Sequence, residues 1–164
     1  MPFNIAPRFS RAVGALCVLA AHLQAHADTY FGRVVGVADG DTVTVLDTSM
    51  VPHKVRLSGI DAPEKKQPFG QRSKESLSNL VFDRWVSVET DKRDRYGREV
   101  GKVLKDGADA NLEQIKRGMA WHYKAYELEQ SELDRKAYGD SELAARSRKI
   151  GLWVDAAPSP PLEF

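Results

Sequence analysis

The stretch V-R-L-S-G-I-D-A-P-E, at residues 55–64, places one arginine and two acids at the end of a predicted strand. Apolar and polar residues alternate at its start, which indicates a strand, and Pro63 cannot donate to a strand ladder. Arg56, Asp61 and Glu64 would then lie close together. An arginine fork suits phosphate oxygens and carboxylates suit hard cations, so the stretch indicates metal-assisted phosphate chemistry. A solvated salt bridge would use the same residues.

Two further short stretches carry charges to strand ends. The dipeptide D-G at residues 39–40 favours a hairpin turn, because both residues tolerate positive φ, and it sets Asp41 at the start of a strand. The stretch D-R-Y-G-R, at residues 94–98, sets Arg98 at the start of another. Taken alone, the first is a turn and the second a solvated loop. Together with residues 55–64 they gather two arginines and three carboxylates on one rim, which is costly unless something binds there.

The elements that must position these charges are short strands and three helices. Strands are predicted from β-branched and aromatic patterns at residues 30–37, 42–46, 53–57, 85–89 and 98–104. Helices are predicted at residues 70–81, around Leu112 and Ile115 with Asp109 or Asn111 as its cap, and from Ser131 onward. This order favours an α+β, mainly β fold: a five-stranded OB-fold barrel with three helices.

The last predicted helix is expected to begin at Ser131, with Asp134 as its capping partner, and to stop at Gly151. Its packed face is expected to carry three apolar side chains, those of Leu133, Ala137 and Ala144. Leu152 and Trp153 are expected to fold back onto the core. His53 and His122 have no metal-ligand spacing, and we expect both on the solvated surface.

The first 27 residues differ from the rest in kind. Arg8 and Arg11 precede an apolar run too short to span a bilayer, and the run ends in A-H-A before a cleavage point after Ala27. Residues 1–27 are therefore predicted to be a secretory signal peptide, residues 28–155 the folded domain and residues 156–164 a Pro-rich disordered tail. Cys17, the single cysteine, would leave with the signal, which excludes thiol and disulfide chemistry in the mature domain.

Basic and acidic residues are concentrated in different segments of the chain, although the net charge is small. Residues 28–164 hold 22 basic and 23 acidic side chains, a formal net charge of −1. Residues 54–75 hold six basic and three acidic side chains, a net charge of +3. Residues 127–142 hold two basic and six acidic side chains, a net charge of −4. A local basic face on a near-neutral protein fits a polyanion bound at one site.

Five stretches together resemble the staphylococcal nuclease, or thermonuclease, family. They occur in family order over nearly all of the predicted mature chain, as V-A-D-G-D-T at residues 37–42, V-R-L-S-G-I-D-A-P-E at 55–64, D-R-Y-G-R at 94–98, G-M-A-W at 118–121 and G-L-W at 151–153. The resemblance implies a five-stranded OB barrel with three helices and cleavage of DNA and RNA with calcium.

The resemblance also implies a metal site. Asp41 and Asp61 are similar to the family's calcium carboxylates, and the backbone carbonyl of Ala62 would complete the protein's direct ligands. Ala62 stands where the family has threonine, a change that leaves the carbonyl in place. Asp39 is similar to an outer-shell acid. Magnesium would also suit so sparse a set of oxygen donors, whereas the family favours calcium.

The remaining site residues implied by the resemblance would act on the substrate. Arg56 and Arg98 are similar to the two arginines on the scissile phosphate, and Glu64 to the glutamate that contacts the attacking water. Tyr96 resembles a tyrosine near the substrate phosphate, and Arg95 beside it is grouped with the substrate-binding residues. Whether Tyr123 or Tyr126 stacks on a base or only packs against the rim stays open.

Two functions compete at this point. The first is an exported, calcium-dependent nuclease acting on single-stranded or loosened DNA and RNA, monomeric, away from the membrane after signal removal, and either periplasmic or extracellular. The second is a non-catalytic OB-fold module that binds nucleic acid. Loss of Arg56, Glu64 or Arg98 would favour the second, and all three are present. The sequence therefore favours the nuclease.

Overall fold

A computed structural model describes residues 28–161, apart from the side chain of Asp91. The predicted signal peptide, with Cys17, lies outside the described residues. None of the helices within residues 28–161 combines the length and the apolar character that a membrane crossing requires.

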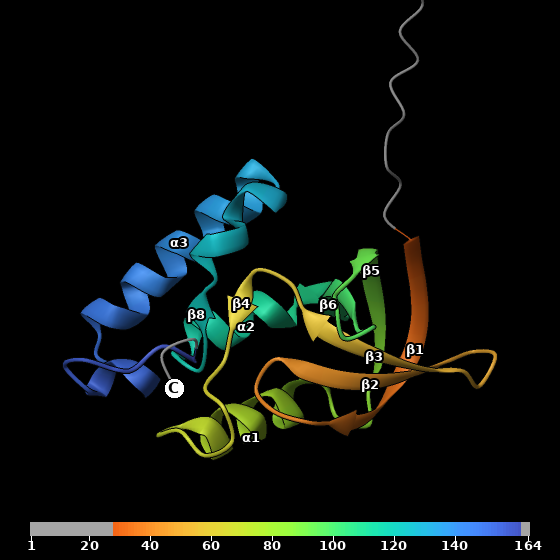
Figure 1. The fold of residues 1–164 in the computed structure, drawn as a ribbon, viewed down its shortest axis with the longest axis horizontal. Helices are drawn as coiled ribbons and strands as arrows, with labels where there is room; N and C mark the ends of the chain where they lie inside the picture. Colours follow the sequence, from red (N-terminus) through yellow and green to blue (C-terminus); the bar gives the residue numbers. More distant parts are fainter. Residues whose placement is uncertain (1–27, 162–164) are drawn as a thin grey trace, which may run out of the picture.

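Five strands form a closed barrel (Figure 1). They are β1 (Asp28–Val37), β2 (Thr42–Asp47), β3 (Pro52–Leu57), β5 (Trp85–Arg93) and β6 (Glu99–Lys105). Antiparallel pairs run from β3 through β2, β1 and β5 to β6, and a parallel pairing of β3 with β6 closes the barrel. The predicted five-stranded OB-fold barrel is confirmed. Every strand predicted from residue patterning is present, within a few residues of its expected ends.

Alternation along the strands fills the barrel. Val43 and Val45 of β2 and Val55 and Leu57 of β3 are fully buried, as is Val34 of β1. Successive side chains of a strand point to opposite faces, so each strand sends every second residue into the interior. The core of the barrel is thus built from β-branched and leucine side chains, which leaves the polar residues at the strand ends free to form a site.

Helices and short strands close one end of the barrel. They are α1 (Gly70–Val81), α2 (Ala110–Lys116), α3 (Glu132–Ser147), the 3₁₀ helices η1 (Lys124–Glu129) and η2 (Gly151–Val154), and the short strands β4 (Ile60–Asp61), β7 (Ala108–Asp109) and β8 (Trp121–His122). Strand β4 pairs with β8. Figure 1 shows β4, β8 and α2 between the barrel and α3, with α1 below them. The three predicted α-helices are confirmed.

The predicted caps and anchor are also confirmed. The Asp109 carboxylate accepts a hydrogen bond from the Leu112 N–H, 3.0 Å away, and the Ser131 hydroxyl accepts one from the Asp134 N–H at 3.1 Å. Leu152 and Trp153 are both buried, and the Leu152 N–H donates to the Gly118 carbonyl at 2.7 Å. The chain after α3 therefore returns to the body of the protein as expected.

The predicted packing face of α3 is wrong for two of its three residues: Ala137 packs, partly buried, against the core, but Leu133 and Ala144 do not. Leu133 is 82 % exposed, and Ala144 is exposed as well. The buried residues of α3 are Tyr138, Glu142 and Ala145. Two of them are polar and are buried because they have partners: the Tyr138 hydroxyl donates to Asp109, and Glu142 accepts from the His122 N–H. The helix also ends at Ser147 rather than at Gly151, since Lys149 already adopts a left-handed φ of 52°.

The expectation that both histidines are solvated is wrong too. His122 is 4 % exposed, with its Nε2 2.7 Å from the Gln130 amide oxygen. His53 bridges two acids from different strands: its ring nitrogens lie 2.9 Å from Glu99 and 3.0 Å from Asp47. Glu99 also accepts a hydrogen bond from the Tyr30 hydroxyl at 2.7 Å. Because β3 and β6 meet here, this network helps to close the barrel.

The His53 network predicts a pH-dependent contribution to stability. Burial opposes protonation, but the hydrogen bonds to Glu99 and Asp47 outweigh it and raise the pKa of His53 above its ordinary value. A raised folded-state pKa stabilises the fold fully below the ordinary value near 6.5 and loses that contribution as pH rises through the folded pKa. Urea unfolding of His53→Gln should therefore show a deficit of about 1 kcal/mol at low pH that shrinks at high pH.

His122→Gln is the matched control. Burial, aided by the nearby Lys124 charge, lowers the pKa of His122, so protonation of this residue destabilises the fold. Its deficit should grow as pH rises, opposite to that of His53→Gln. An equal deficit for His53→Gln at both ends of the pH range would contradict the charged bridge.

Candidate active site

The centre of the site is a guanidinium between two carboxylates. Arg56 Nη2 donates to Asp61 Oδ1 at 2.7 Å and lies 3.5 Å from Asp41 Oδ2. Arg56 is on β3, Asp61 ends β4, and Asp41 directly precedes β2. The register of β2 with β3 pairs Thr42 with Arg56, and the Leu57 N–H donates to the Asp41 carbonyl at 2.8 Å. The predicted meeting of Asp41 and Asp61 is therefore observed.

Both carboxylates are almost fully buried. Asp41 is 6 % and Asp61 8 % exposed. Burial raises the pKa of Asp41 to about 7, although the Arg56 charge acts against it. Burial likewise raises the pKa of Asp61 to about 6, again opposed by Arg56. One arginine therefore does not neutralise two desolvated carboxylates, and a further positive charge would stabilise the cluster.

Backbone and outer residues hold Asp41 in place. The Ala62 N–H donates to Asp41 Oδ2 at 3.0 Å, and the Thr42 hydroxyl donates to Asp41 Oδ1 at 3.0 Å. Asp39 Oδ1 accepts from the Asp41 N–H at 3.1 Å. Ala62 and Asp39 therefore lie beside Asp41, where the sequence placed them. Asp39 touches the backbone of Asp41 and not its carboxylate, which suits an outer position.

Arg98 reaches the same rim from the loop before β6. Its Nε donates to Asp94 Oδ2 at 2.7 Å, and its Nη1 lies 3.4 Å from the hydroxyl of Thr42. Asp94 also accepts from the N–H groups of Tyr96 and Arg98, at 2.9 and 3.0 Å. A single carboxylate thus shapes the loop and orients the arginine. The sequence singled out Arg98 but assigned no role to Asp94.

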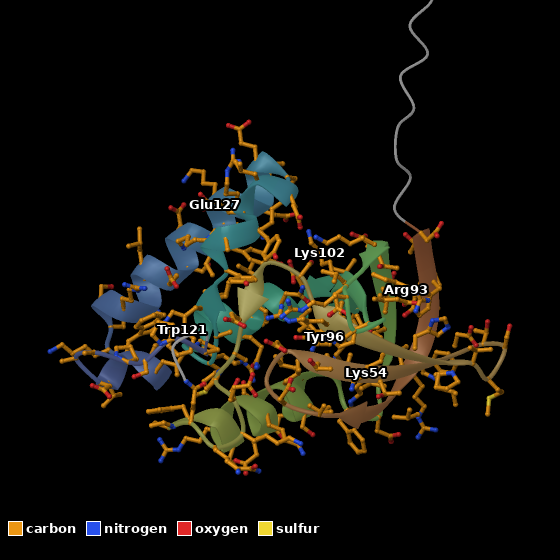
Figure 2. All side chains as sticks on the ribbon, viewed as in Figure 1. Lys54, Arg93, Tyr96, Lys102, Trp121 and Glu127 are labelled. Atoms are coloured by element: carbon orange, nitrogen blue, oxygen red, sulfur yellow. The ribbon has the colours of Figure 1, made fainter. Side chains whose placement is uncertain are left out.

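Tyr96 and Arg95 occupy the exposed tip of that loop. Tyr96 is 68 % exposed, and its ring centroid lies 4.9 Å from the Arg95 guanidinium carbon and 5.5 Å from that of Arg98. Figure 2 shows Tyr96 and Trp121 on either side of β4. Tyr96 therefore borders the rim through Arg98. Arg95 contacts Tyr96 and makes no ion pair within residues 28–161, so the structure does not bring it to the carboxylates.

Glu64 lies just outside the buried cluster. Its side chain is exposed, and its charge contributes to the raised pKa of Asp61. Its backbone is fixed by Gln67, whose amide oxygen accepts from the Glu64 N–H at 2.6 Å and whose own N–H donates to the Glu64 carbonyl at 2.9 Å. Gln67 is 5 % exposed and sits in a loop with no sequence signal for burial. The site thus has a free carboxylate on a restrained backbone.

Gln114 is a second supporting residue that sequence reasoning missed. It is fully buried on α2, and its Nε2 donates to the Gly40 carbonyl at 2.8 Å and to the Ser73 carbonyl at 3.1 Å. A Cβ on Gly40 would overlap the Ser73 hydroxyl, so glycine is required where α1 approaches the turn. Apolar periodicity identifies neither contact. Gln114 holds the residue before Asp41 from the far side of the core.

The donor set fits a hard divalent cation held by few protein ligands. No group of three or more His, Cys, Asp or Glu side chains within residues 28–161 has the geometry of a complete metal site. The buried carboxylates of Asp41 and Asp61 both contact Arg56, and Ala62, the third residue of the predicted ligand set, contacts Asp41 through its N–H. Hard oxygen ligands are those that calcium and magnesium prefer. The uncompensated burial of Asp41 and Asp61 supplies the physical reason for a cation there.

Tyr123 lies next to the cluster as well. The Arg56 guanidinium carbon is 5.5 Å from the centroid of the Tyr123 ring, and the Tyr123 and Tyr126 rings are 5.1 Å apart. The Tyr123 N–H donates to the Gly59 carbonyl at 2.9 Å, which ties this residue to the loop before β4. Of the two tyrosines left open by the sequence, Tyr123 therefore packs against Arg56, and Tyr126 is half exposed beyond it.

Known proteins with similar sequences identify the family of this chain. The profile of the family described as staphylococcal nuclease homologue matches residues 54–155. An uncharacterized endonuclease of Haemophilus influenzae is 42 % identical over 132 residues, which cover 80 % of this chain and 71 % of that protein.

Two further relatives match more of the chain. A micrococcal nuclease of Shigella flexneri is 38 % identical over 163 residues, covering 94 % of this chain and 90 % of its own length. Protein ParB of Escherichia coli is 37 % identical over 158 residues, covering 88 % and 84 %. With the barrel and the charged rim, these matches lead to one conclusion: the chain belongs to the staphylococcal nuclease family and is a nuclease.

Proposed function

We propose that this nuclease is calcium-dependent and hydrolyses phosphodiester bonds of DNA and RNA, favouring single-stranded or loosened substrate. The observation that carries the proposal is the meeting of Arg56 with two buried, undercompensated carboxylates, 2.7 and 3.5 Å away, beside an exposed Glu64. Two buried carboxylates that share one arginine keep negative charge that a bound cation would offset. A bound cation and an anionic phosphate would together satisfy the charges on this rim.

The metal assignment rests on the oxygen donors. Asp41, Asp61 and the carbonyl of Ala62 would hold calcium. When bound, calcium would supply positive charge against the phosphate, whose negative charge grows in the transition state. Because the protein offers few ligands, oxygens of the substrate would complete the coordination, so cation and substrate should bind cooperatively.

The two arginines are proposed to bind the scissile phosphate. Arg56 uses Nη1 and Nη2 toward the Ile60 carbonyl and Asp61, and Arg98 uses Nε and Nη1 toward Asp94 and Thr42. A guanidinium has five N–H donors, so each keeps donors for phosphate oxygens. Existing partners hold both forks in place before substrate arrives, and a preorganised donor is worth more in the transition state than one that must reorient.

Glu64 is proposed to orient or deprotonate the attacking water. Its backbone is fixed by Gln67, and its carboxylate makes no hydrogen bond within residues 28–161, so it is available to a water. Tyr96 and Arg95 are proposed to contact the substrate next to the scissile phosphate. The exposed rings of Tyr96 and Tyr126 support a preference for unpaired strands, because only unstacked bases offer faces to an aromatic ring.

The first 27 residues are proposed to direct export. Their charge, apolar run and A-H-A ending support cleavage after Ala27 and an enzyme in the periplasm or the medium. We also propose that the exported enzyme acts as a monomer.

Export is tested by the mass of the protein from its native host. The mature protein should begin at Asp28, since small side chains at Ala25 and Ala27 suit a signal peptidase. Mass spectrometry of the folded protein measures this start. A chain that keeps Met1 or begins at Pro2 would contradict the proposal.

Asp41→Asn tests the metal site. Removing one of two carboxylates should weaken calcium binding by at least the about 10- to 100-fold that loss of an outer partner costs. Isothermal titration of the mature protein with calcium measures the affinity. The fold should survive in chelator, because the change removes a buried charge that Arg56 compensates only in part. Asp106→Asn, at an exposed turn, is the control and should bind calcium like the wild type.

Glu64→Gln separates a nuclease from a binding module. The variant keeps the shape of the side chain but loses the proton acceptor, so single-turnover cleavage should fall by about 10²- to 10⁴-fold. Binding of a short single strand with calcium should be unchanged or tighter, because one negative charge beside a polyanion is gone. Glu75→Gln, an exposed acid on α1, is the control.

The outcomes are distinct. Cleavage by Glu64→Gln within a few-fold of the wild type would remove Glu64 from the catalytic role. A wild type that binds single strands with calcium but never cleaves them would support the binding module instead.

A further inference from the structure

An open pocket lies beside the proposed catalytic rim, between β4 and α1. Its volume is about 420 Å³, and its lining residues are Lys65, Gln67, Pro68, Phe69, Gln71 and Arg72. The roles proposed above for the arginines, the carboxylates and the tyrosines do not use this pocket. Its lining combines two cations, two amides and one aromatic ring, which are the groups that bind a sugar-phosphate chain.

The cations of the pocket are available to a ligand. Lys65 and Arg72 are exposed, and neither they nor the adjoining Lys66 form an ion pair within residues 28–161. The Arg72 guanidinium carbon lies 5.1 Å from the centroid of the Phe69 ring. Stacking on an aromatic face orients the guanidinium while its N–H donors stay free at the edge. Arg72 is thus positioned for a phosphate.

Hydrogen bonds and backbone packing connect the pocket to Glu64. Gln67, which lines it, accepts from the Glu64 N–H at 2.6 Å, and the Gly70 N–H donates to the Gln67 carbonyl at 3.0 Å. A Cβ on Gly70 would overlap the Glu64 carbonyl, so the start of α1 packs directly on the backbone of that residue. A ligand in the pocket therefore lies next to the rim at a fixed offset from the proposed reaction centre.

The opposite side of the rim repels a polyanion. Around η1 and α3 the lysines are paired with acids: Lys92 with Glu129, Lys102 with Asp134, Lys124 with Glu142 and Lys136 with Asp140. Residues 127–142 carry a net charge of −4, against +3 for residues 54–75. Figure 2 shows Glu127 on the far side of β4 from α1. A strand leaving the scissile position is drawn toward α1 and away from α3.

We propose that the pocket of Lys65, Phe69 and Arg72 is a phosphate subsite, which binds a non-reacting phosphodiester of the substrate strand adjacent to the scissile one. The inference rests on the proposed nuclease reaction and adds the direction that the strand takes across the protein. Lys65 and Arg72 bind the phosphate, and Phe69, which packs against the buried cluster of Trp121 and Trp153, holds the Arg72 guanidinium in position. Binding energy gained there serves only substrates long enough to reach it.

The test compares substrates of different length. In Lys65→Gln/Arg72→Gln, kcat/KM for a single strand of about 12 nucleotides should fall about tenfold, whereas kcat/KM for a dinucleotide should stay as in the wild type. Arg84→Gln is the matched control: Arg84 is exposed, makes no ion pair within residues 28–161 and follows the opposite end of α1. It should leave both substrates unaffected.

Salt dependence gives a second readout, which does not need cleavage. In a Glu64→Gln background, binding of the longer strand in calcium should weaken on adding the double substitution. The slope of log K against log salt should shrink by about 0.7 to 1.4, as expected for one or two lost single-strand phosphate contacts. The Arg84→Gln control should keep the full slope.

The outcomes decide between the two proposals. An equal loss on both substrates, or a loss on neither with an unchanged salt slope, would overturn the subsite. If the wild type cleaves neither substrate, the proposed reaction is wrong, and the salt dependence of binding alone tests the subsite. A smaller slope in the double variant would then support phosphate binding in the pocket. An unchanged slope would contradict it.

Discussion

The structure depends on the burial of two carboxylates beside a single guanidinium. Asp41 and Asp61 are each more than nine-tenths buried, and Arg56 contacts both. Such an arrangement is costly in free energy unless more positive charge arrives, so the surroundings must hold it in place. Gln114 does so through the Gly40 carbonyl, and Ala62 through its N–H to Asp41. The helices that cover the end of the barrel thus fix the turn before Asp41 as well as completing the core.

Barrel closure is the second requirement of the site. The parallel pairing of β3 with β6 sets Arg56 opposite Val100, which brings the loop before β6 over β2 and places Arg98 3.4 Å from Thr42. Without that pairing the two arginines would belong to opposite edges of a sheet. The His53 and Glu99 bridge lies at the same seam. The same contacts that complete the fold therefore bring the two proposed phosphate-binding groups to one rim.

Local features of this chain could be predicted from sequence, and long-range polar contacts could not. Residues 70–81 showed helical periodicity and were predicted correctly. The hairpin at residues 39–40 was predicted correctly too, but not for the expected reason: neither Asp39 nor Gly40 adopts a positive φ, and the glycine is needed for the close approach of Ser73. Gln114 and Glu142 are buried because their partners come from distant segments, and the side-chain amide of Gln67 contacts both the nearby Glu64 and the distant Pro160. Apolar periodicity treats such residues as exposed, which is why the predicted packed face of α3 included Ala137 correctly but missed Tyr138 and Glu142.

The most direct test of the account is the rate at which the mature protein digests heat-denatured DNA over a series of free calcium concentrations. If Asp41, Asp61 and Arg56 form a rim that a cation must complete, cleavage should rise with calcium to a plateau. It should stop in excess chelator and return when calcium is restored. Undiminished cleavage in chelator would contradict the account, because the buried carboxylates would then need another explanation.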